Sequence, residues 1–514
     1  MRALAPEFRP YAWAPPTDEV ARLAGIDPSQ VLRFDQNTPP LPLASTRPGT
    51  VAGALARVSG YPAGGYRTLR RAIAEYAGTE PENVVLGAGA DDLILLCARA
   101  YAGPGDTVAI PEAPTYPLYR IAAQLAGAHV STRHEPGGAL ALTFACRPNN
   151  PTGALDPLPA GRPLVVDEAY FEYAGETAYD PDDESVVVLR TFSKLFGLAG
   201  ARIGYALAAR EVADELNARQ APAPVSTLSA ALAVAALAER PDPSEQIAER
   251  ERLAAALRAL GLQPLESHTN FLYVPVEDGL ALGEVLLRQG IVVRAYPEAI
   301  RASVRDTEDD DLLLEALARV LDRPAPVAAS GGRRVRVLRA TAETRLAVRL
   351  ALDGASRVRV ATGAGLYDHF LEQLAFHGGF DLVLEGAGDL ETGDHHTAED
   401  AALALGQALD AALGDRRGIA RYGDAVVPMD DALARAAVDL GGRAHSELRL
   451  EHDPGMATHM LASLAQAARA SIHVEASGRD GHHVAEAAFK AVGRALRAAT
   501  RPEGAGLPST KGLL

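Results

Sequence analysis

The chain has 514 residues, 48% of them hydrophobic, which is enough for two to four domains with substantial cores. Acidic residues outnumber basic ones by 66 to 50, and the net charge of −16 argues against nucleic acid or an anionic membrane as a main partner. Two cysteines, no apolar leader in residues 1–16 and no apolar run long enough for a membrane span lead us to expect a reducing, cytoplasmic location.

Up to about residue 320, alanine-rich helical segments alternate with short β-branched runs. The clearest runs are 83–86, 107–110, 164–166 and 186–189. Strands that alternate with helices are typical of an α/β domain with a mostly parallel sheet. We expect this first domain, which includes a smaller subdomain, to cover residues 1–323.

Three motifs in this domain carry chemistry. Residues 148–153 read PNNPTG, residues 165–170 read VVDEAY, and residues 188–194 read VLRTFSK. In open α/β sheets, ligands bind at the carboxyl ends of the strands, where Asp167 and Lys194 are expected. Pyridoxal phosphate needs a lysine for a Schiff base and a buried acid that keeps its ring nitrogen protonated. The pattern therefore favours Lys194 and Asp167 as the catalytic pair.

Other polar groups fit the rest of this cofactor. Asn150 and Tyr170 are suited to hydrogen-bond the ring 3′-oxygen. The glycine-rich turn 87–92, with Ala90 and Asp91, precedes a helix predicted at 92–100, and a helix N-terminus binds phosphate well. Ser193 and Arg202 would add donors to the phosphate. Each motif alone is weak, and only the ordered set is specific.

In this order the motifs resemble fold-type I aminotransferases, and RFDQNTP at 33–39 with YPAGGY at 61–66 resembles their histidinol-phosphate branch. The resemblance covers residues 30–320. It implies that Tyr66 reaches the cofactor phosphate across a dimer interface and that Tyr116 lies at the cofactor ring. It also implies that Arg301 binds the α-carboxylate of glutamate and that Asn37 and Arg294 contact the substrate.

Two departures leave the substrate of this domain open. The usual hydroxyl-Asp-Glu sequence of the turn is Ala90-Asp91-Asp92, and Arg305 replaces a glycine after the strand of Arg301. An aminotransferase for another substrate, or a related decarboxylase, is the alternative.

The stretch 324–333 is rich in proline, alanine, serine and glycine, and we expect it to be a linker. Residues 334–339 and 344–352 then alternate like the strands of a hairpin, so a second domain is predicted over 334–514.

This second domain contains an internal repeat. HHTAEDAALALGQALDAA at 395–412 matches HHVAEAAFKAVGRALRAA at 482–499, and His482 stands 87 residues after His395. His369 and His459 lead the two copies, 90 residues apart. The repeat predicts an α+β domain built by duplication.

The HHxxE spacing predicts metal ligands. On a helix, Glu399 lies four residues after His395 and three after His396, so these side chains share a face. Six histidines and two glutamates could furnish two metal sites if adjacent histidines point to different ions, and such a set suits Mn²⁺ at least as well as zinc. The candidate ligands are His369, His395, His396, Glu399, His459, His482, His483 and Glu486.

From 335 to 514 the motifs LYDHFL (366–371), DHHT (394–397), GIARYG (418–423) and PSTKG (508–512) resemble imidazoleglycerol-phosphate dehydratase. The resemblance implies two Mn²⁺ on these eight ligands, acting as Lewis acids and template on imidazoleglycerol phosphate. It also implies that Glu343 is an acid/base. The catalytic residues expected in the two domains together are Lys194, Asp167, Tyr170, Glu343, Glu399 and Glu486.

The same resemblance implies contacts to the substrate phosphate. These residues are Arg421, Arg443, Lys490, Ser509 and Lys511. Gly393 replaces the usual aspartate, Gly441 a serine and Gly455 a glutamate, and the loop between His473 and His482 is one residue short. These departures concern groups that support the ligands, and no ligand is lost.

The two resemblances connect chemically. The dehydratase product, imidazole-acetol phosphate, is the amino acceptor of histidinol-phosphate aminotransferase, so the fusion would join consecutive steps of histidine biosynthesis. The families also imply a 24-subunit dehydratase shell and an aminotransferase dimer, hence a large homo-oligomer. The alternative for the second domain is an inactive metal-dependent assembly scaffold.

Overall fold

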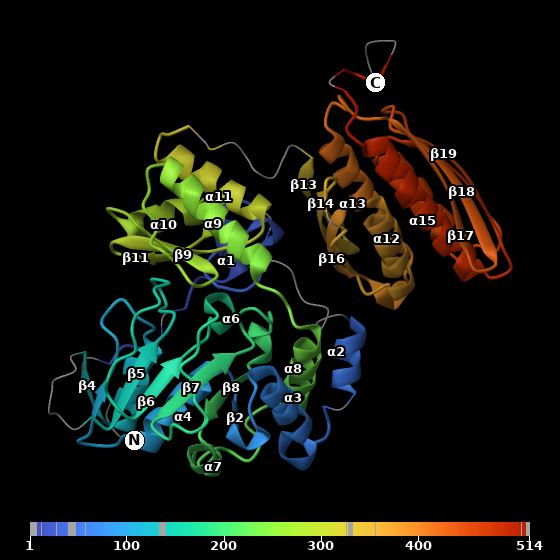
Figure 1. The fold of residues 1–514 in the computed structure, drawn as a ribbon. Coiled ribbons are helices and arrows are strands. Elements are labelled where there is room, and N and C mark those ends of the chain that lie inside the picture. The colour runs from blue at the N-terminus through green and yellow to red at the C-terminus, as the bar shows by residue number, and fades with distance from the viewer. Residues whose placement is uncertain are drawn as a thin grey trace. The chain divides into compact units, whose positions relative to one another are not determined.

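The computed structural model describes residues 8–509 except 12, 27, 40–47, 57, 133–139, 325, 327–332, 355 and 505. The chain divides into two compact units, Met1–Val327 and Ala328–Leu514 (Figure 1), and the division falls inside the segment 324–333 predicted as a linker. Each unit is described by itself below.

The N-terminal unit is built on a seven-stranded sheet in the order β2-β8-β7-β6-β5-β3-β4. From β7 to β4 all neighbours are parallel, and β8 is antiparallel to both β2 and β7, so the sheet is mostly parallel as predicted. The strands are β2 (Val84–Gly87), β3 (Thr107–Ala109), β4 (His129–Ser131), β5 (Leu142–Cys146), β6 (Leu164–Asp167), β7 (Val186–Thr191) and β8 (Gly204–Ala208).

Both faces of this sheet are buried. Alternate residues of a strand point to opposite faces, so Val186 and Val188 join one apolar cluster while Val187 and Leu189 join the other. Helices α3 (Arg67–Ala77) and α8 (Thr227–Glu239) contribute to the first cluster. Helices α4 (Ala90–Tyr101), α5 (Leu118–Ala126) and α7 (Arg210–Ala218) contribute to the second. Burial on both faces explains why these strands are continuous apolar runs.

A smaller antiparallel sheet of order β11-β12-β9 forms the second part of this unit. Its strands are β9 (Phe271–Pro275), β11 (Arg294–Tyr296) and β12 (Ala299–Ser303), and a parallel pair joins β1 (Leu32–Arg33) to β10 (Ile291–Val292). The helices that accompany this part are α1 (Thr17–Ala24), α9 (Ser244–Ala259), α10 (Gly279–Leu287) and α11 (Thr307–Val320). The unit also contains α2 (Pro48–Leu55) and α6 (Phe171–Ala174).

Several predicted strand boundaries were off by one or two residues, and the start of β2 is the clearest case. Asn83 ends a short 3₁₀ helix that begins at Pro81, and its side-chain amide donates to the Ala208 carbonyl at 2.8 Å. The strand β2 therefore begins at Val84. The predicted helix 92–100 is confirmed within the longer α4.

The C-terminal unit contains two four-stranded sheets of the same topology, β13-β14-β16-β15 and β17-β18-β20-β19. In each, the first two pairings are antiparallel and the last is parallel, and the predicted hairpin of 334–339 and 344–352 is the pair β13–β14. The strands are β13 (Arg334–Ala340), β14 (Thr344–Ala351), β15 (Val358–Ala361), β16 (Asp381–Gly388), β17 (Tyr422–Met429), β18 (Ala432–Asp439), β19 (His445–Leu450) and β20 (Ser471–Ser477).

Each sheet is accompanied by two helices, α12 (Gly365–Gly378) and α13 (His395–Leu413) in the first half, α14 (Ala457–Ala467) and α15 (Gly481–Thr500) in the second. The helices lie between the sheets (Figure 1), with α12 against α15 and α13 against α14. The order strand-strand-strand-helix-strand-helix thus occurs twice, as a duplication would produce. The duplication itself stays a prediction.

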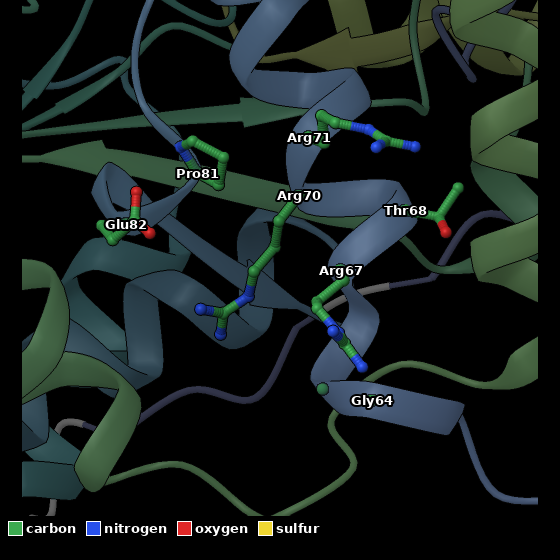
Figure 2. A pocket seen from close by; sticks show the side chains of 8 residues that line it. Gly64, Arg67, Thr68, Arg70, Arg71, Pro81 and Glu82 are labelled. Atoms are coloured by element: carbon green, nitrogen blue, oxygen red, sulfur yellow. The ribbon is translucent and has the colours of Figure 1, made fainter.

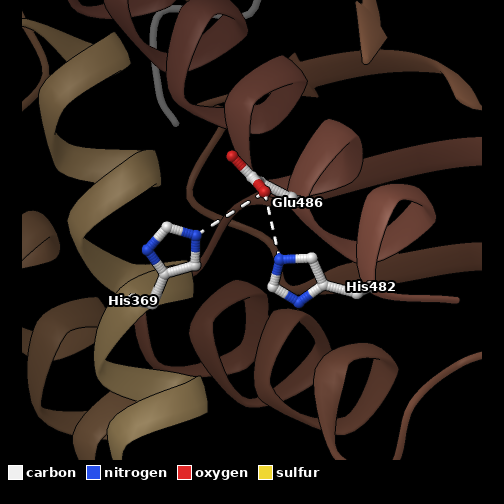
Figure 3. Close-up of side chains that lie close together, drawn as sticks. All are labelled: His369, His482 and Glu486. Carbon is white, nitrogen blue, oxygen red and sulfur yellow. Dashed lines mark ion pairs between the residues drawn. The ribbon is translucent and has the colours of Figure 1, made fainter. Parts of the chain in front are cut away.

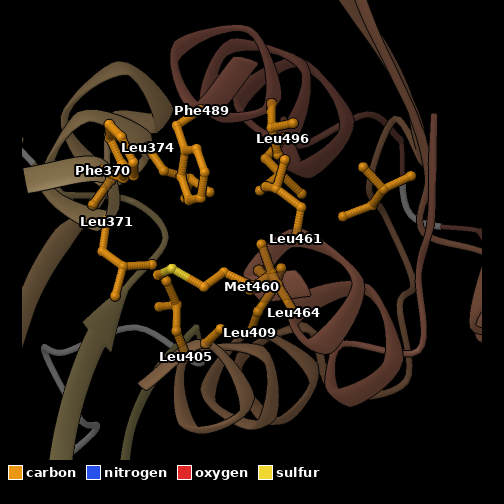
Figure 4. Close-up of a cluster of buried hydrophobic side chains, with 14 of the residues drawn as sticks. Phe370, Leu371, Leu374, Leu405, Leu409, Met460, Leu461, Leu464, Phe489 and Leu496 are labelled. Carbon is orange, nitrogen blue, oxygen red and sulfur yellow. The ribbon is translucent and has the colours of Figure 1, made fainter. Parts of the chain in front are cut away.

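The four helices enclose one apolar core, in which aromatic and leucine side chains from both halves interdigitate (Figure 4). Phe370 of α12 stacks on Phe489 of α15 at 5.2 Å between ring centroids, and both are at most 1% exposed. Burying a side chain of this size contributes about 2–3 kcal/mol. This core fixes α12 against α15 and therefore the polar residues that those helices carry. Among the described residues, no helix is both long and apolar enough to cross a membrane.

Candidate active sites

The predicted cofactor residues of the N-terminal unit gather at one edge of the large sheet. Asp167 is the last residue of β6, Asn150 follows β5, and Lys194 lies three residues after β7 ends. Because these three strands are parallel, their carboxyl ends meet at the same edge. The sheet topology, which spacing alone does not determine, brings the three residues together.

Asp167 is a buried carboxylate with its own hydrogen-bond support. It is 4% exposed, and it accepts the Tyr119 hydroxyl at 2.7 Å and the Ala169 amide at 3.1 Å. Burial raises the pKa of Asp167 to about 6, and the hydrogen bonds from Tyr119 and Ala169 oppose that rise. The carboxylate is therefore ionised at neutral pH and suited to hold a protonated ring nitrogen.

The Lys194 amine lies 5.5 Å from the centroid of the Tyr170 ring. Burial, followed by repulsion from Arg301, lowers the pKa of Lys194 to about 8. At pH 7 about a tenth of the amine is then neutral, far more than for an exposed lysine. A neutral amine is the form that attacks an aldehyde, so the environment of Lys194 favours covalent chemistry.

Two hydrogen bonds around this edge connect residues that follow strands of the large sheet to Asn37 and to Arg301 of β12. The Asn37 amide donates to the Tyr170 hydroxyl at 2.9 Å, and Arg301 donates to the Asn150 side-chain oxygen at 2.6 Å. Arg301 is 6% exposed and also donates to the Asp35 carbonyl at 2.8 Å. The residues predicted to bind ring oxygen and substrate carboxylate are thus adjacent, and their roles stay predictions.

The predicted phosphate turn covers 87–92, but α4 already begins at Ala90, with Gly89 as the residue that precedes its first turn. Asp91 accepts a hydrogen bond from Tyr116 at 2.9 Å and pairs with Arg202 at 2.9 Å. A Cβ atom at Gly89 would stand 2.8 Å from an Arg202 nitrogen, so only glycine lets this guanidinium approach the turn closely. Ser193, also predicted here, is buried and accepts from Thr191 at 2.9 Å.

The structure shows the surroundings of Tyr66 and Arg294 within one chain, and their predicted roles stay untested. The buried Tyr66 hydroxyl donates to the Val225 carbonyl of its own chain at 2.6 Å. Arg294 stands opposite Arg301 in the register of β11 and β12, and its guanidinium lies 5.8 Å from the Tyr11 ring centroid. A contact of Tyr66 across a dimer interface stays a prediction.

A cavity of about 650 Å³ lies beside the loop that carries Tyr66. Arg67, Arg70 and Arg71 line it, but their guanidinium groups point in different directions (Figure 2). Neither Lys194 nor Asp167 belongs to its walls, so it is separate from the cofactor edge.

The C-terminal unit brings the predicted metal ligands into two groups of three. In the first, His369 and His482 lie 3.6 and 3.3 Å from Glu486 (Figure 3), and the two imidazole rings are stacked 5.8 Å apart. In the second, His395 and His459 lie 3.7 and 3.3 Å from Glu399. Among the described residues these are the groups whose ligand atoms all lie within 4.8 Å of one another.

Each group crosses the repeat. His369 comes from the first repeat and joins the helix α15 of the second, while His459 comes from the second and joins α13 of the first. The contacts of α12 with α15 and of α13 with α14 produce this exchange. Two imidazoles and one carboxylate suit a divalent transition metal.

His396 and His483, the second histidine of each HH pair, lie outside these groups. A carboxylate holds the Nδ1 atom of each, Asp389 at 3.1 Å for His396 and Asp431 at 2.7 Å for His483. The hydrogen bond to Asp389 raises the pKa of His396, and that to Asp431 raises the pKa of His483. A carboxylate on Nδ1 directs Nε2 toward a metal in carboxylate–histidine–metal sites; here Nε2 of His483 also lies 3.6 Å from Asp430, and metal binding by the two histidines stays a prediction.

The other residues that the dehydratase resemblance singled out do not gather in one place. Glu343 lies in the turn between β13 and β14, 3.8 Å from His396. Arg421 pairs with Asp439 at 2.7 Å and donates to the Pro508 carbonyl at 2.8 Å, next to Ser509. Lys490 instead pairs with Glu486 at 2.7 Å. Arg443 is exposed, and Lys511 lies outside the described residues.

Two family models match this chain. The model described as Aminotransferase class I and II matches residues 30–317, more than half of the chain. The model described as Imidazoleglycerol-phosphate dehydratase matches residues 362–496. An imidazoleglycerol-phosphate dehydratase from Salinispora tropica is 49% identical over 201 residues, which cover 35% of this chain and 99% of that protein. The chain belongs to both families.

Other relatives agree with this assignment. The dehydratase of Methanothermobacter thermautotrophicus is 49% identical over 190 residues, covering 35% of this chain and 98% of that protein. One from Phytophthora nicotianae is 47% identical over 212 residues, and the chain spans only 47% of its length. A solved histidinol-phosphate aminotransferase of Sinorhizobium meliloti, in complex with pyridoxal-5′-phosphate, is 26% identical with a TM-score of 0.53, covering 62% of this chain and 98% of that chain.

The departures from the dehydratase family are accommodated locally. At Gly441 a Cβ atom would lie 2.8 Å from an Arg421 nitrogen and 3.0 Å from the Asp439 carboxylate, so the glycine lets this ion pair pack against the backbone. Gly455 has a φ of 144°, which side chains rarely adopt, and a Cβ there would meet the Tyr367 hydroxyl at 2.9 Å. Around Gly393 the space is open.

Several polar residues of the sites were missed from sequence. Tyr119 lies on α5, and no motif or spacing in the sequence links it to Asp167. No spacing rule links Asp389 and Asp431 to His396 and His483. Asp400, next to Glu399, gave no signal because its partners lie about 60 residues earlier in the chain.

Proposed function

We propose that the chain is a bifunctional enzyme of histidine biosynthesis. The C-terminal unit dehydrates imidazoleglycerol phosphate to imidazole-acetol phosphate, and the N-terminal unit transaminates that ketone with glutamate to histidinol phosphate. The observation that carries the proposal is the pair of cross-repeat His-His-Glu groups, in a unit 49% identical to dehydratases along nearly their full length.

In the N-terminal unit the residues fit pyridoxal phosphate. Lys194 offers an amine of lowered pKa, the buried Asp167 offers a carboxylate for the ring nitrogen, and the turn before α4 offers backbone amides for a phosphate. When bound, the cofactor supplies an electron sink for the amino-group transfer. Asn150 and Tyr170 orient the ring, Lys194 moves the proton at the substrate α-carbon, and Arg301 holds the carboxylate of glutamate.

In the C-terminal unit the donors fit two divalent ions, which we take to be Mn²⁺. When bound, such ions supply Lewis acidity toward the imidazole of the substrate. His369, His482 and Glu486 would hold one ion, and His395, Glu399 and His459 the other. Glu343, beside His396, would move a proton at the reacting carbons.

A complete site would require neighbouring copies of the chain. His396 and His483 lie outside the two groups, and a carboxylate on Nδ1 of each would direct Nε2 to an ion. The residues expected to contact the phosphate also lie apart from one another in one chain. The backbone amide of Arg421 donates to the Ala499 carbonyl of α15. Lys490 stands nine residues before Ala499 on the same helix, a distance of roughly 13 Å along its axis. A large homo-oligomer, such as the 24-subunit shell with paired aminotransferase units, would supply the missing ligands.

The two activities would follow one another on one substrate. The ketone released by the C-terminal unit is the amino acceptor of the N-terminal unit. This relationship supports histidinol phosphate as the transamination product, because both family assignments then serve a single pathway.

The decisive experiment follows the two steps separately. Metal-stripped protein is incubated with imidazoleglycerol phosphate and Mn²⁺, and the ketone is assayed before glutamate and pyridoxal phosphate are added. We expect the ketone only with metal, and histidinol phosphate only after the second addition. Ketone without histidinol phosphate would assign another substrate to the N-terminal unit, and a panel of keto acids would identify it. Metal binding without ketone would favour an assembly scaffold.

A size measurement tests the assembly. Light scattering of the metal-loaded protein should show a particle of many subunits, and chelation should reduce its size if neighbouring copies share the ions. A monomer or dimer with full dehydratase activity would contradict shared ligands.

A further inference from the structure

Asp400 lies on α13 immediately after the candidate ligand Glu399, but its side chain faces the first sheet rather than the metal group. It is 7% exposed. Arg339 of β13 pairs with it at 2.6 Å, and the hydroxyl of Thr344 at the start of β14 donates to its second oxygen. Thr341 donates to the same oxygen at 3.4 Å. The buried Asp400 carboxylate thus bonds to residues on both sides of the β13–β14 turn.

That turn carries Glu343. Its backbone amide donates to the Thr341 hydroxyl oxygen at 3.2 Å, and its carbonyl accepts the Asp389 amide at 3.1 Å. Asp389 in turn holds the Nδ1 atom of His396. The backbone of Glu343 is therefore fixed from two directions, by Asp400 through Thr341 and by Asp389.

The second repeat lacks this device. Ala487 stands 87 residues after Asp400, at the matching position of the second HHxxE helix, and cannot accept a hydrogen bond through its side chain. The matching β17–β18 turn carries Asp430 and Asp431 instead, and both lie close to His483, at 3.6 and 2.7 Å. The two repeats share a topology but support their turns differently, and only the turn of Glu343 is held by a carboxylate from the ligand helix.

We propose that Asp400 is a positioning residue that holds the Thr341–Thr344 turn so that Glu343 is aligned for proton transfer in the dehydration. The inference rests on the proposed function of the C-terminal unit. The helix α13 would then position the metal ligands His395 and Glu399 directly and the acid/base carboxylate of Glu343 through Asp400. The helix would thereby fix the position of Glu343 relative to the metal ligands.

The test compares Asp400→Asn with Asp410→Asn in the full-length, Mn²⁺-loaded protein. Asp410 lies on the same helix and pairs with Arg469 at 2.9 Å, but it stands ten residues, about 15 Å, further along. Misplacing a reacting group by about 1 Å costs on the order of 100-fold in rate. We therefore expect kcat of dehydration to fall roughly 10- to 100-fold in Asp400→Asn, with KM and metal content unchanged, and to stay near wild type in Asp410→Asn.

A double variant separates positioning from general stability. If Asp400 acts through Glu343, adding Asp400→Asn to Glu343→Gln should cost no further activity. An additional loss of the same size as in the wild-type background would overturn the proposal, as would an Asp400→Asn variant with wild-type kcat.

A measurement that does not depend on activity tests whether Asp400 holds the turn. Amide hydrogen exchange of residues 340–346 should be faster in Asp400→Asn than in Asp410→Asn or wild type. Equal exchange in all three proteins would overturn the positioning role even if activity falls. Absence of dehydration by the wild-type protein would instead count against the proposed function, and the exchange result would still decide whether Asp400 holds the turn.

Discussion

The imidazole of His369 lies 3.6 Å from the carboxylate of Glu486, although the two residues belong to different repeats of the C-terminal unit. The histidine reaches the second repeat because α12 packs against α15 through Phe370 and Phe489. The symmetric pair, His459 and Glu399, lies at 3.3 Å for the same reason. The two candidate metal groups therefore depend on the packing of the repeats against each other.

This pairing predicts which variants affect the same ion. His369→Ala and His482→Ala should each weaken one metal site, and the double variant should bind as much metal as either single variant. His369→Ala combined with His395→Ala should weaken both sites, because these residues belong to different groups. Metal content per chain, measured by mass spectrometry after dialysis, checks the prediction.

His473→Ala is the control for these metal measurements. His473 is an exposed histidine on β20, outside both groups. If His369→Ala and His395→Ala together behaved like either single variant, ligands would pair within a repeat and the cross-repeat assignment would be wrong.

The lowered pKa of Lys194 predicts how the apo protein reacts with pyridoxal phosphate. Only the neutral amine attacks the aldehyde, so the rate should rise with pH through a midpoint near 8 and then level off. Arg301 contributes to the lowering, so Arg301→Gln should move the midpoint upward. Stopped-flow absorbance across pH 6–10 measures both profiles. Arg294→Gln, on the neighbouring strand, should leave the midpoint in place; an unshifted Arg301→Gln would contradict the assigned cause.

Tyr119 is expected to support the cofactor through Asp167. Tyr119→Phe removes the hydrogen bond that lowers the pKa of Asp167, so that pKa should rise above 6 and less carboxylate should remain at neutral pH. A buried hydrogen bond to a charged group contributes about 1.5–3 kcal/mol, so affinity for pyridoxal phosphate should fall on the order of tenfold or more.

Fluorescence titration of the apo protein measures this affinity. Tyr173→Phe is the matched control, because the Tyr173 hydroxyl donates to Gln246 at 2.6 Å and does not contact Asp167. Equal losses in both variants would show a general packing effect instead.

The core of the C-terminal unit should be sensitive to truncation at Phe489. Phe489→Ala removes the ring that stacks on Phe370 and should destabilise this unit by about 3–5 kcal/mol. Phe376→Ala, at a position 56% exposed on α12, should change stability by at most about 0.5 kcal/mol. Calorimetry of the full chain checks this, with the transition of the N-terminal unit as internal reference. Equal shifts in the two variants would contradict the core assignment.

The sequence by itself determined which chemistry each half carries. Apolar runs and glycine-rich turns predicted the mostly parallel sheet, because buried parallel strands require continuous apolar residues. The HHxxE spacing placed His395 with Glu399, and His482 with Glu486, because helical periodicity puts residues four apart on one face. Ordered motifs around Lys194 and Asp167 predicted the cofactor edge.

Only the tertiary structure decided how these pieces combine. The exchange of His369 and His459 between repeats depends on which helices pack together, and local periodicity carries no information about that choice. Tyr119, Asp389, Asp431 and Asp400 act on partners that the strand order or a neighbouring turn brings close. Short-range sequence patterns indicate on which face of a helix or strand a side chain lies. The burial of a shared core determines which other element packs against that face.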